Sequence, residues 1–146
     1  MASELDLMLF QQHLEELPGL PQVARWTVKR GDPASLDVTV DLSSRKAPQE
    51  LYRVRLRWTD YAKPPSVKFI DMATGSETEA RAWPVFDGSR PTSFFICVPF
   101  TQEGFAHHPE WATGINAYPV LEDPLQYVLL SLQSLLDITY TGRCQP

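Results

Sequence analysis

A cysteine followed by two adjacent histidines is the most reactive combination of side chains in this 146-residue chain. Cys97 lies in the apolar run FFICVPF, and His107 and His108 follow it by ten and eleven residues. A cysteine thiolate is a strong nucleophile, but a thiol is mostly protonated at neutral pH. An imidazole folded back onto the cysteine could accept the thiol proton, or a proton from an attacking amine. Cys97, His107 and His108 are therefore the candidate catalytic residues.

The same residues allow two other interpretations. A cysteine in an apolar run is typical of a buried small hydrophobic side chain, and adjacent histidines are typical of a polar loop tip. Zinc is a further alternative, because it takes cysteine, histidine and carboxylate ligands in tetrahedral geometry. Its ligands would be Cys97, His107 and His108 with Glu110 or Cys144, although no CxxC or HxxxH spacing supports them.

Composition narrows the class of protein. A hydrophobic content of 43% with 21% charged residues is ordinary for a globular domain. The net charge of -5 argues against a protein whose main partner is nucleic acid. Glu4 and Asp6 stand where a secretory signal needs positive charge, and no apolar run reaches the length of about 18 residues needed to span a membrane. We expect a soluble cytoplasmic protein without membrane contact or organic cofactor, in which Cys97 and Cys144 remain free thiols.

Helical periodicity is clear near both ends of the chain. Ser3 followed by Asp6 resembles a capping box, and apolar residues then recur at helical spacing until Pro18. Asp123 followed by Pro124 is typical of a helix start, and a leucine-rich apolar stripe follows to residue 136. These patterns predict an N-terminal helix and a C-terminal core helix.

Alternating residues between these helices predict strands near 26–30, 36–42, 52–58 and 67–70, arranged as an antiparallel meander. Asp37 and Asp41 could face Arg53, Arg55 and Arg57 on the neighbouring strand, either as a docking surface or as a solvated face with ion pairs. Residues 72–124 lack a regular pattern and predict one long loop that contains Cys97. We expect a single α+β domain over residues 1–146, with its core at about 3–137 and a short C-terminal tail.

Two segments carry a resemblance to a known family. The run WTDYAKPPSVKF (residues 58–69) resembles the passage between the third and fourth strands of ubiquitin-conjugating enzymes, and VLLSLQSLL (residues 128–136) resembles the start of the helix after their active site. Trp83-Pro84 lies where the family usually has His-Pro-Asn, and Cys97 lies where it has the catalytic cysteine. The element order is also similar, and the chain looks like one of the divergent bacterial relatives.

The resemblance implies a UBC-like fold in which Cys97 carries the C-terminal acyl group of a ubiquitin-like partner as a thioester and passes it to an amine. It implies an activating enzyme, a ubiquitin-like modifier or a nucleotidyltransferase tail as protein partners, and an antiviral conjugation system as the setting. An acidic residue near the end of the loop would assist the amine, and Glu110, Glu122 and Asp123 are available. Val85 replaces the usual asparagine, which favours a non-catalytic UBC-like binding module as the alternative.

Overall fold

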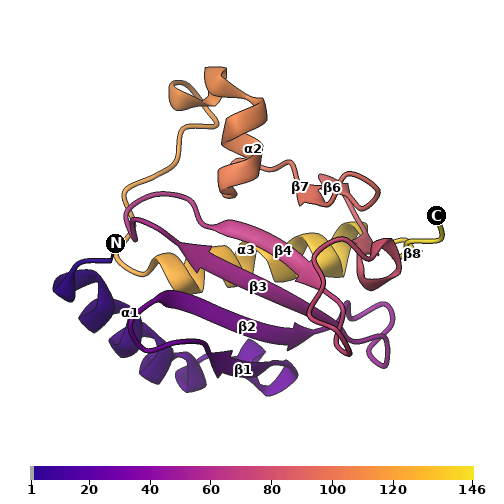
Figure 1. Ribbon diagram of the computed structural model, residues 1–146, viewed down its shortest axis with the longest axis horizontal. Helices are drawn as coiled ribbons and strands as arrows, with labels where there is room; N and C mark the ends of the chain where they lie inside the picture. Colours follow the sequence, from indigo (N-terminus) through magenta and orange to yellow (C-terminus); the bar gives the residue numbers. More distant parts are fainter. Residues whose placement is uncertain (1) are drawn as a thin grey trace.

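The alternating segments of the sequence form a four-stranded antiparallel sheet in the computed structural model, which describes residues 2–146 (Figure 1). The strands follow one another in sequence order, so the predicted meander is confirmed. Along the second strand buried and part-buried residues alternate strictly, because one face of the sheet packs on the core and the other does not. The strands are β1 (Thr27–Arg30), β2 (Leu36–Leu42), β3 (Tyr52–Trp58) and β4 (Ser66–Ile70).

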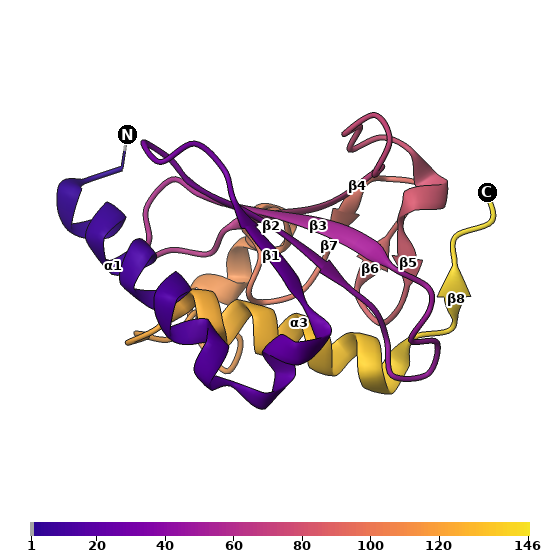
Figure 2. The same ribbon diagram turned by 90° about the horizontal axis from the view of Figure 1, so that it is seen from below.

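Two long helices cover one face of this sheet, as the view in Figure 2 shows. Helix α1 (Glu4–Glu16) begins at Ser3, whose Oγ accepts a hydrogen bond from the Asp6 N–H at 3.0 Å. Helix α3 (Pro124–Thr139) begins at Asp123, whose carboxylate accepts one from the Gln126 N–H at 3.0 Å. Both predicted helices and their caps are confirmed. No helix within residues 2–146 is long and apolar enough to cross a bilayer.

Tyr61, in the turn between β3 and β4, joins the two helices to the sheet. Its hydroxyl lies 2.7 Å from His13 Nδ1 of α1 and accepts a hydrogen bond from the Leu125 N–H of α3 at 3.3 Å. Its ring packs edge-on against Phe10 and Trp58 in the core. Burial raises the pKa of this hydroxyl, because the phenolate would be poorly solvated. The aspartate-tyrosine turn is therefore a structural junction of the fold.

The segment between β4 and α3 contains more regular structure than the predicted long loop. The sequence prediction missed a helix here, and with it a hairpin that places Cys97. The short elements are η3 (Ala80–Ala82), β5 (Pro84–Val85), β6 (Ser89–Arg90), β7 (Phe95–Ile96), α2 (Gln102–His107) and η4 (Pro109–Ala112). Two further 3-10 turns, η1 (Leu17–Gly19) and η2 (Pro21–Arg25), connect α1 to β1.

The C-terminal residues, for which the sequence predicted no structure, pair with this segment. Helix α3 continues to Thr139, and β8 (Gly142–Arg143) then runs antiparallel to β5. The Thr141 N–H donates to the Val85 carbonyl at 2.9 Å, and the Cys144 N–H donates to the Trp83 carbonyl at 2.9 Å. Residues 139–144 are therefore packed against the chain that leads to Cys97.

Two of the three arginines on β3 form the expected cross-strand ion pairs. Arg53 lies opposite Asp41 and bonds it at 2.7 Å, and Arg57 lies opposite Asp37 at 3.2 Å. Arg55 faces Thr39 instead and turns to Glu77 at 2.8 Å. The two outer arginines of β3 thus pair with aspartates on β2, and the central arginine pairs with a glutamate outside the sheet.

Asp137 on α3 is predicted to contribute strongly to stability. Its carboxylate accepts hydrogen bonds from the Arg25 guanidinium at 2.9 and 3.0 Å, the Arg45 N–H at 2.9 Å and the Gln133 side chain at 2.9 Å. Its side chain is 15% exposed. We expect Asp137→Asn to lower the free energy of unfolding by about 1–3 kcal/mol at pH 7, because an amide cannot accept all of these donors. Urea unfolding of both proteins measures this difference.

The Asp137 prediction has a pH signature. Burial alone would raise the pKa of Asp137, but the hydrogen bonds from Arg25, Arg45 and Gln133 outweigh it and lower the pKa below the ordinary 3.8. The stabilisation is therefore complete above pH 3.8 and is lost as the pH falls through the lowered, folded-state value. Repeating the unfolding below pH 3 should shrink the difference between wild type and Asp137→Asn, and an undiminished difference there would contradict this account.

Candidate functional site

Cys97 directly follows the β6–β7 hairpin and continues its pairing. Its N–H donates to the Gly88 carbonyl at 2.7 Å, and Ser89 pairs with Ile96 as the next step of the ladder. Ile96 is fully buried, whereas Phe95 and Cys97 are half-buried. Because side chains alternate along an extended chain, Phe95 and Cys97 share the less buried side of the hairpin. Cys97 is a free thiol, and so is Cys144.

Gly88 holds the backbone of Cys97 in a way that no other residue type would. Its φ of 95° lies in the left-handed region that glycine tolerates best. A Cβ at this position would lie 3.1 Å from the Cys97 carbonyl oxygen and would overlap the Val98 side chain. The close approach of the two chains therefore needs a glycine, and it restricts where the thiol can lie.

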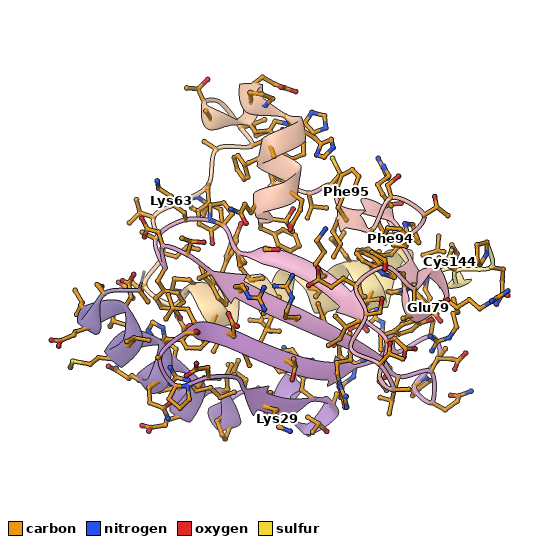
Figure 3. The ribbon with its side chains drawn as sticks, in the orientation of Figure 1. Lys29, Lys63, Glu79, Phe94, Phe95 and Cys144 are labelled. Atoms are coloured by element: carbon orange, nitrogen blue, oxygen red, sulfur yellow. The ribbon has the colours of Figure 1, made fainter. Side chains whose placement is uncertain are left out.

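Phe94 adopts a conformation that is unusual for a bulky residue. Its φ of 61° is left-handed, which costs roughly 1–2 kcal/mol for a residue with a Cβ. The Lys68 ammonium group donates to the Phe94 carbonyl, and the Phe94 ring packs against Trp83. Figure 3 shows Phe94 and Phe95 on the hairpin beside helix α2. The surrounding contacts thus hold the hairpin in a strained shape immediately before Cys97.

His107 is the last residue of helix α2, not part of an irregular loop as the sequence predicted. Its Nδ1 lies 3.0 Å from the Glu103 carbonyl oxygen, which can only accept a hydrogen bond. The proton of a neutral His107 ring is therefore on Nδ1, and Nε2 carries the lone pair. The ring stacks on Phe95 with centroids 4.3 Å apart and planes 10° apart. His107 therefore contacts the hairpin at Phe95, two residues before Cys97.

His108 is held by a different set of partners. Its Nδ1 donates to the Glu110 carboxylate at 2.8 Å, and its ring stacks on Trp111 with centroids 4.2 Å apart. This hydrogen bond lowers the pKa of Glu110. His108 therefore packs within the η4 turn, whereas His107 packs against the hairpin that carries Cys97. The two histidines could not be distinguished in the sequence, but in the structure they have different stacking partners.

The structure also shows where the remaining candidates from the sequence lie, and Glu122 is exposed. Asp123 caps α3, and Glu110 is bonded to His108, so neither carboxylate is free of a partner. Trp83 is fully buried and packs against Phe69, which makes it a core residue. Within residues 2–146, no three histidine, cysteine, aspartate or glutamate side chains are grouped closely enough to hold a metal ion. The zinc alternative therefore lacks a ligand set in this part of the chain.

Three residues of the site were not recognised from the sequence: Gly88, Phe95 and Glu103. Glu103 belongs to helix α2. The sequence signal for the start of this helix is Thr101, whose Oγ accepts a hydrogen bond from the Gly104 N–H at 3.0 Å. A threonine followed by Gln102 and Glu103 is an acceptable helix start. The six-residue length of α2 and the glycine inside it hid this signal.

Comparison with known proteins identified no relative: no family model, no curated protein and no solved structure matches this chain. Function is therefore inferred from the site itself and from the residues that form it.

Proposed function

We propose that this chain is a ubiquitin-conjugating-enzyme-like acyltransferase of UBC-like fold, in which Cys97 carries the C-terminal acyl group of a partner protein as a thioester. The observation that carries the proposal is a half-buried free thiol directly after a tightly held hairpin, with the His107 imidazole stacked on Phe95, two residues before it. Acyl transfer needs a nucleophile with a base within reach, and the stack on Phe95 brings an imidazole to the hairpin that precedes Cys97. The similarity of residues 58–69 and 128–136 to ubiquitin-conjugating enzymes points to the same chemistry.

In the loading step, the Cys97 sulfur attacks the carbonyl carbon of a thioester on an activating partner. A new carbon–sulfur bond forms to Cys97, the partner's thiolate leaves, and the Cys97 proton passes to Nε2 of His107. This assignment follows from the hydrogen bond of Nδ1 to the Glu103 carbonyl, which leaves Nε2 as the basic atom. The exchange converts one thioester into another, so it needs no cofactor.

In the transfer step, an amine attacks the same carbonyl carbon and the Cys97 thiolate leaves. His107 first gives the proton it took during loading to the departing thiolate of the partner. Nε2 then accepts one proton from the amine, and an amide bond remains. The usual asparagine side chain is absent, because Val85 occupies that position and is paired with the tail strand β8. The backbone and side chains around Cys97 therefore have to replace whatever stabilisation that asparagine supplies to the oxyanion.

The partners that this chemistry requires are proteins: an activating enzyme and a ubiquitin-like modifier, or a nucleotidyltransferase whose tail is the acyl cargo. An antiviral conjugation system in a bacterial cytoplasm is the setting that the resemblance suggests. A second candidate is a non-catalytic UBC-like module that binds proteins, and the replacement of the asparagine by Val85 favours it.

A loading assay separates the two candidates. A peptide with a C-terminal glycine thioester is incubated with the folded protein at pH 7, and mass spectrometry of the intact chain and its peptides follows the adduct. The enzyme proposal predicts loading on Cys97 about ten times faster than on N-acetylcysteine, because the imidazole held on the hairpin would assist the proton transfer. Loading no faster than on N-acetylcysteine would favour the binding module. Cys97→Ala, which lacks the nucleophile, is the control for adducts elsewhere.

A further inference from the structure

Arg55 differs from the other two arginines of β3 by its burial. Its side chain is only 10% exposed, whereas the side chains of Arg53 and Arg57 are 35% and 53% exposed. Its Nε donates to Glu77 at 2.8 Å, one terminal nitrogen donates to Ser66 Oγ at 3.3 Å, and the other has no hydrogen-bond partner within the described residues. A buried guanidinium with an incomplete set of acceptors is costly, which suggests that Arg55 contributes more than packing.

Ser66 connects Arg55 to helix α2. Its hydroxyl donates to Glu103 Oε2 at 2.5 Å, and the Val67 N–H donates to Glu103 Oε1 at 3.1 Å. The Gln102 N–H also donates to the Pro65 carbonyl at 2.7 Å. The first turn of α2 is therefore bonded to the beginning of β4 by two of its residues.

Glu103 links this attachment to His107. Its carboxylate holds the start of α2 on the sheet, and its own carbonyl oxygen accepts the hydrogen bond from His107 Nδ1, one helical turn later. The stack of His107 on Phe95 then depends on where α2 lies relative to the hairpin. Because the ring is also held by Phe95, a shift of the first turn would move the Glu103 carbonyl relative to Nδ1 and weaken the hydrogen bond that fixes the tautomer.

We propose that Arg55, Ser66 and Glu103 are positioning residues that set the place and the tautomer of His107 on the hairpin that precedes Cys97. None of them touches the reacting atoms. Arg55 orients Ser66, Ser66 and the Val67 N–H hold Glu103, and Glu103 holds His107. The inference rests on the proposed roles of Cys97 and His107. The effect of Arg55 on the His107 imidazole can nevertheless be measured without any acyl transfer.

The test compares Arg55→Met and Ser66→Ala with Arg57→Met, an exposed neighbour on the same strand, and with Ser66→Thr, which keeps the hydroxyl. The ring ¹⁵N spectrum of His107 reports which nitrogen carries the proton, and peptide mapping gives the rate at which iodoacetamide alkylates Cys97 at pH 7. We expect Arg55→Met and Ser66→Ala to populate the other His107 tautomer and to slow alkylation by about 3- to 10-fold, since small displacements of a positioned base have effects of this size. Arg57→Met and Ser66→Thr should match the wild type.

Circular dichroism and thermal unfolding confirm that each variant is folded. Arg55→Met and Ser66→Ala each remove one partner of the hydrogen bond between Arg55 and Ser66. The proposal is overturned if both leave the His107 spectrum and the alkylation rate at the values of Arg57→Met. It is also overturned if they slow alkylation while the His107 spectrum stays unchanged. If the variants change both readouts but the wild type loads no faster than N-acetylcysteine, the positioning inference stands and the proposed acyltransferase function fails.

Discussion

Gly104→Ala will lower the free energy of unfolding by about 2 kcal/mol and detach helix α2, although alanine is the better helix former. Gly104 is buried, and a Cβ there would lie 2.9 Å from the Val98 nitrogen and overlap the Val98 carbonyl oxygen. Both are backbone atoms, so no side-chain rotation relieves the contact. The gain in helix propensity is about 1 kcal/mol, and overpacking of this kind costs up to about 3 kcal/mol.

Gly19→Ala is the matched control for Gly104→Ala. Within residues 2–146, no atom other than those of its chain neighbours lies within 4 Å of a Cβ at Gly19, so the change should leave stability within about 0.5 kcal/mol of the wild type. Chemical unfolding gives both free energies, and amide exchange of residues 102–107 reports whether α2 is still docked. Equal stability of the two variants would show that the turn from Val98 to Gly104 is looser than these contacts indicate.

His107→Gln will slow loading of Cys97 by roughly 10- to 100-fold at pH 7 if the imidazole takes the thiol proton. Glutamine is close to histidine in size and can donate to the Glu103 carbonyl as His107 Nδ1 does, but it offers no basic nitrogen. The expected loss is therefore chemical, and the unfolding midpoint should change little. The rate of adduct formation with the glycine thioester peptide, followed by mass spectrometry, gives the comparison.

His108→Gln is the control for this loss. His108 stacks on Trp111 and bonds to Glu110, away from the Phe95 contact that brings His107 to the hairpin. We expect its loading rate to stay within about twofold of the wild type, since surface substitutions without catalytic contact have small effects. A larger loss in His108→Gln than in His107→Gln would reverse the assignment of the base.

The sheet was predictable because its pattern is local and repeated. Strict alternation over residues 36–42 and 52–58 fixes which side chains face the core, and the ion pairs Asp37–Arg57 and Asp41–Arg53 then follow from an antiparallel register. The caps at Ser3 and Asp123 are equally local signals. Elements whose stability resides in their own sequence were therefore found with nearly correct bounds.

The surroundings of Cys97 were harder to predict because long-range contacts hold them. Helix α2 is too short to be stable alone and depends on the bonds from Glu103 to Ser66 and Val67, more than thirty residues earlier. The strand β8 consists of two residues whose partner, β5, lies far away in the sequence. Nothing in the local pattern reports such pairings, so the sequence identified His107 as a candidate but not the helix or the ring contact that brings it to the hairpin.

The most direct test of the central claim is transfer of the acyl group from Cys97 to an amine. The protein is loaded with the glycine peptide, freed of excess thioester and mixed with lysine, and the loss of the adduct is timed against the same peptide thioester on N-acetylcysteine. An acyltransferase site should pass the peptide to lysine about ten times faster than the unstructured thioester, as positioned bases accelerate such reactions at least this much. Aminolysis at the rate of the unstructured thioester would contradict the claim that this fold uses Cys97 as an acyl carrier.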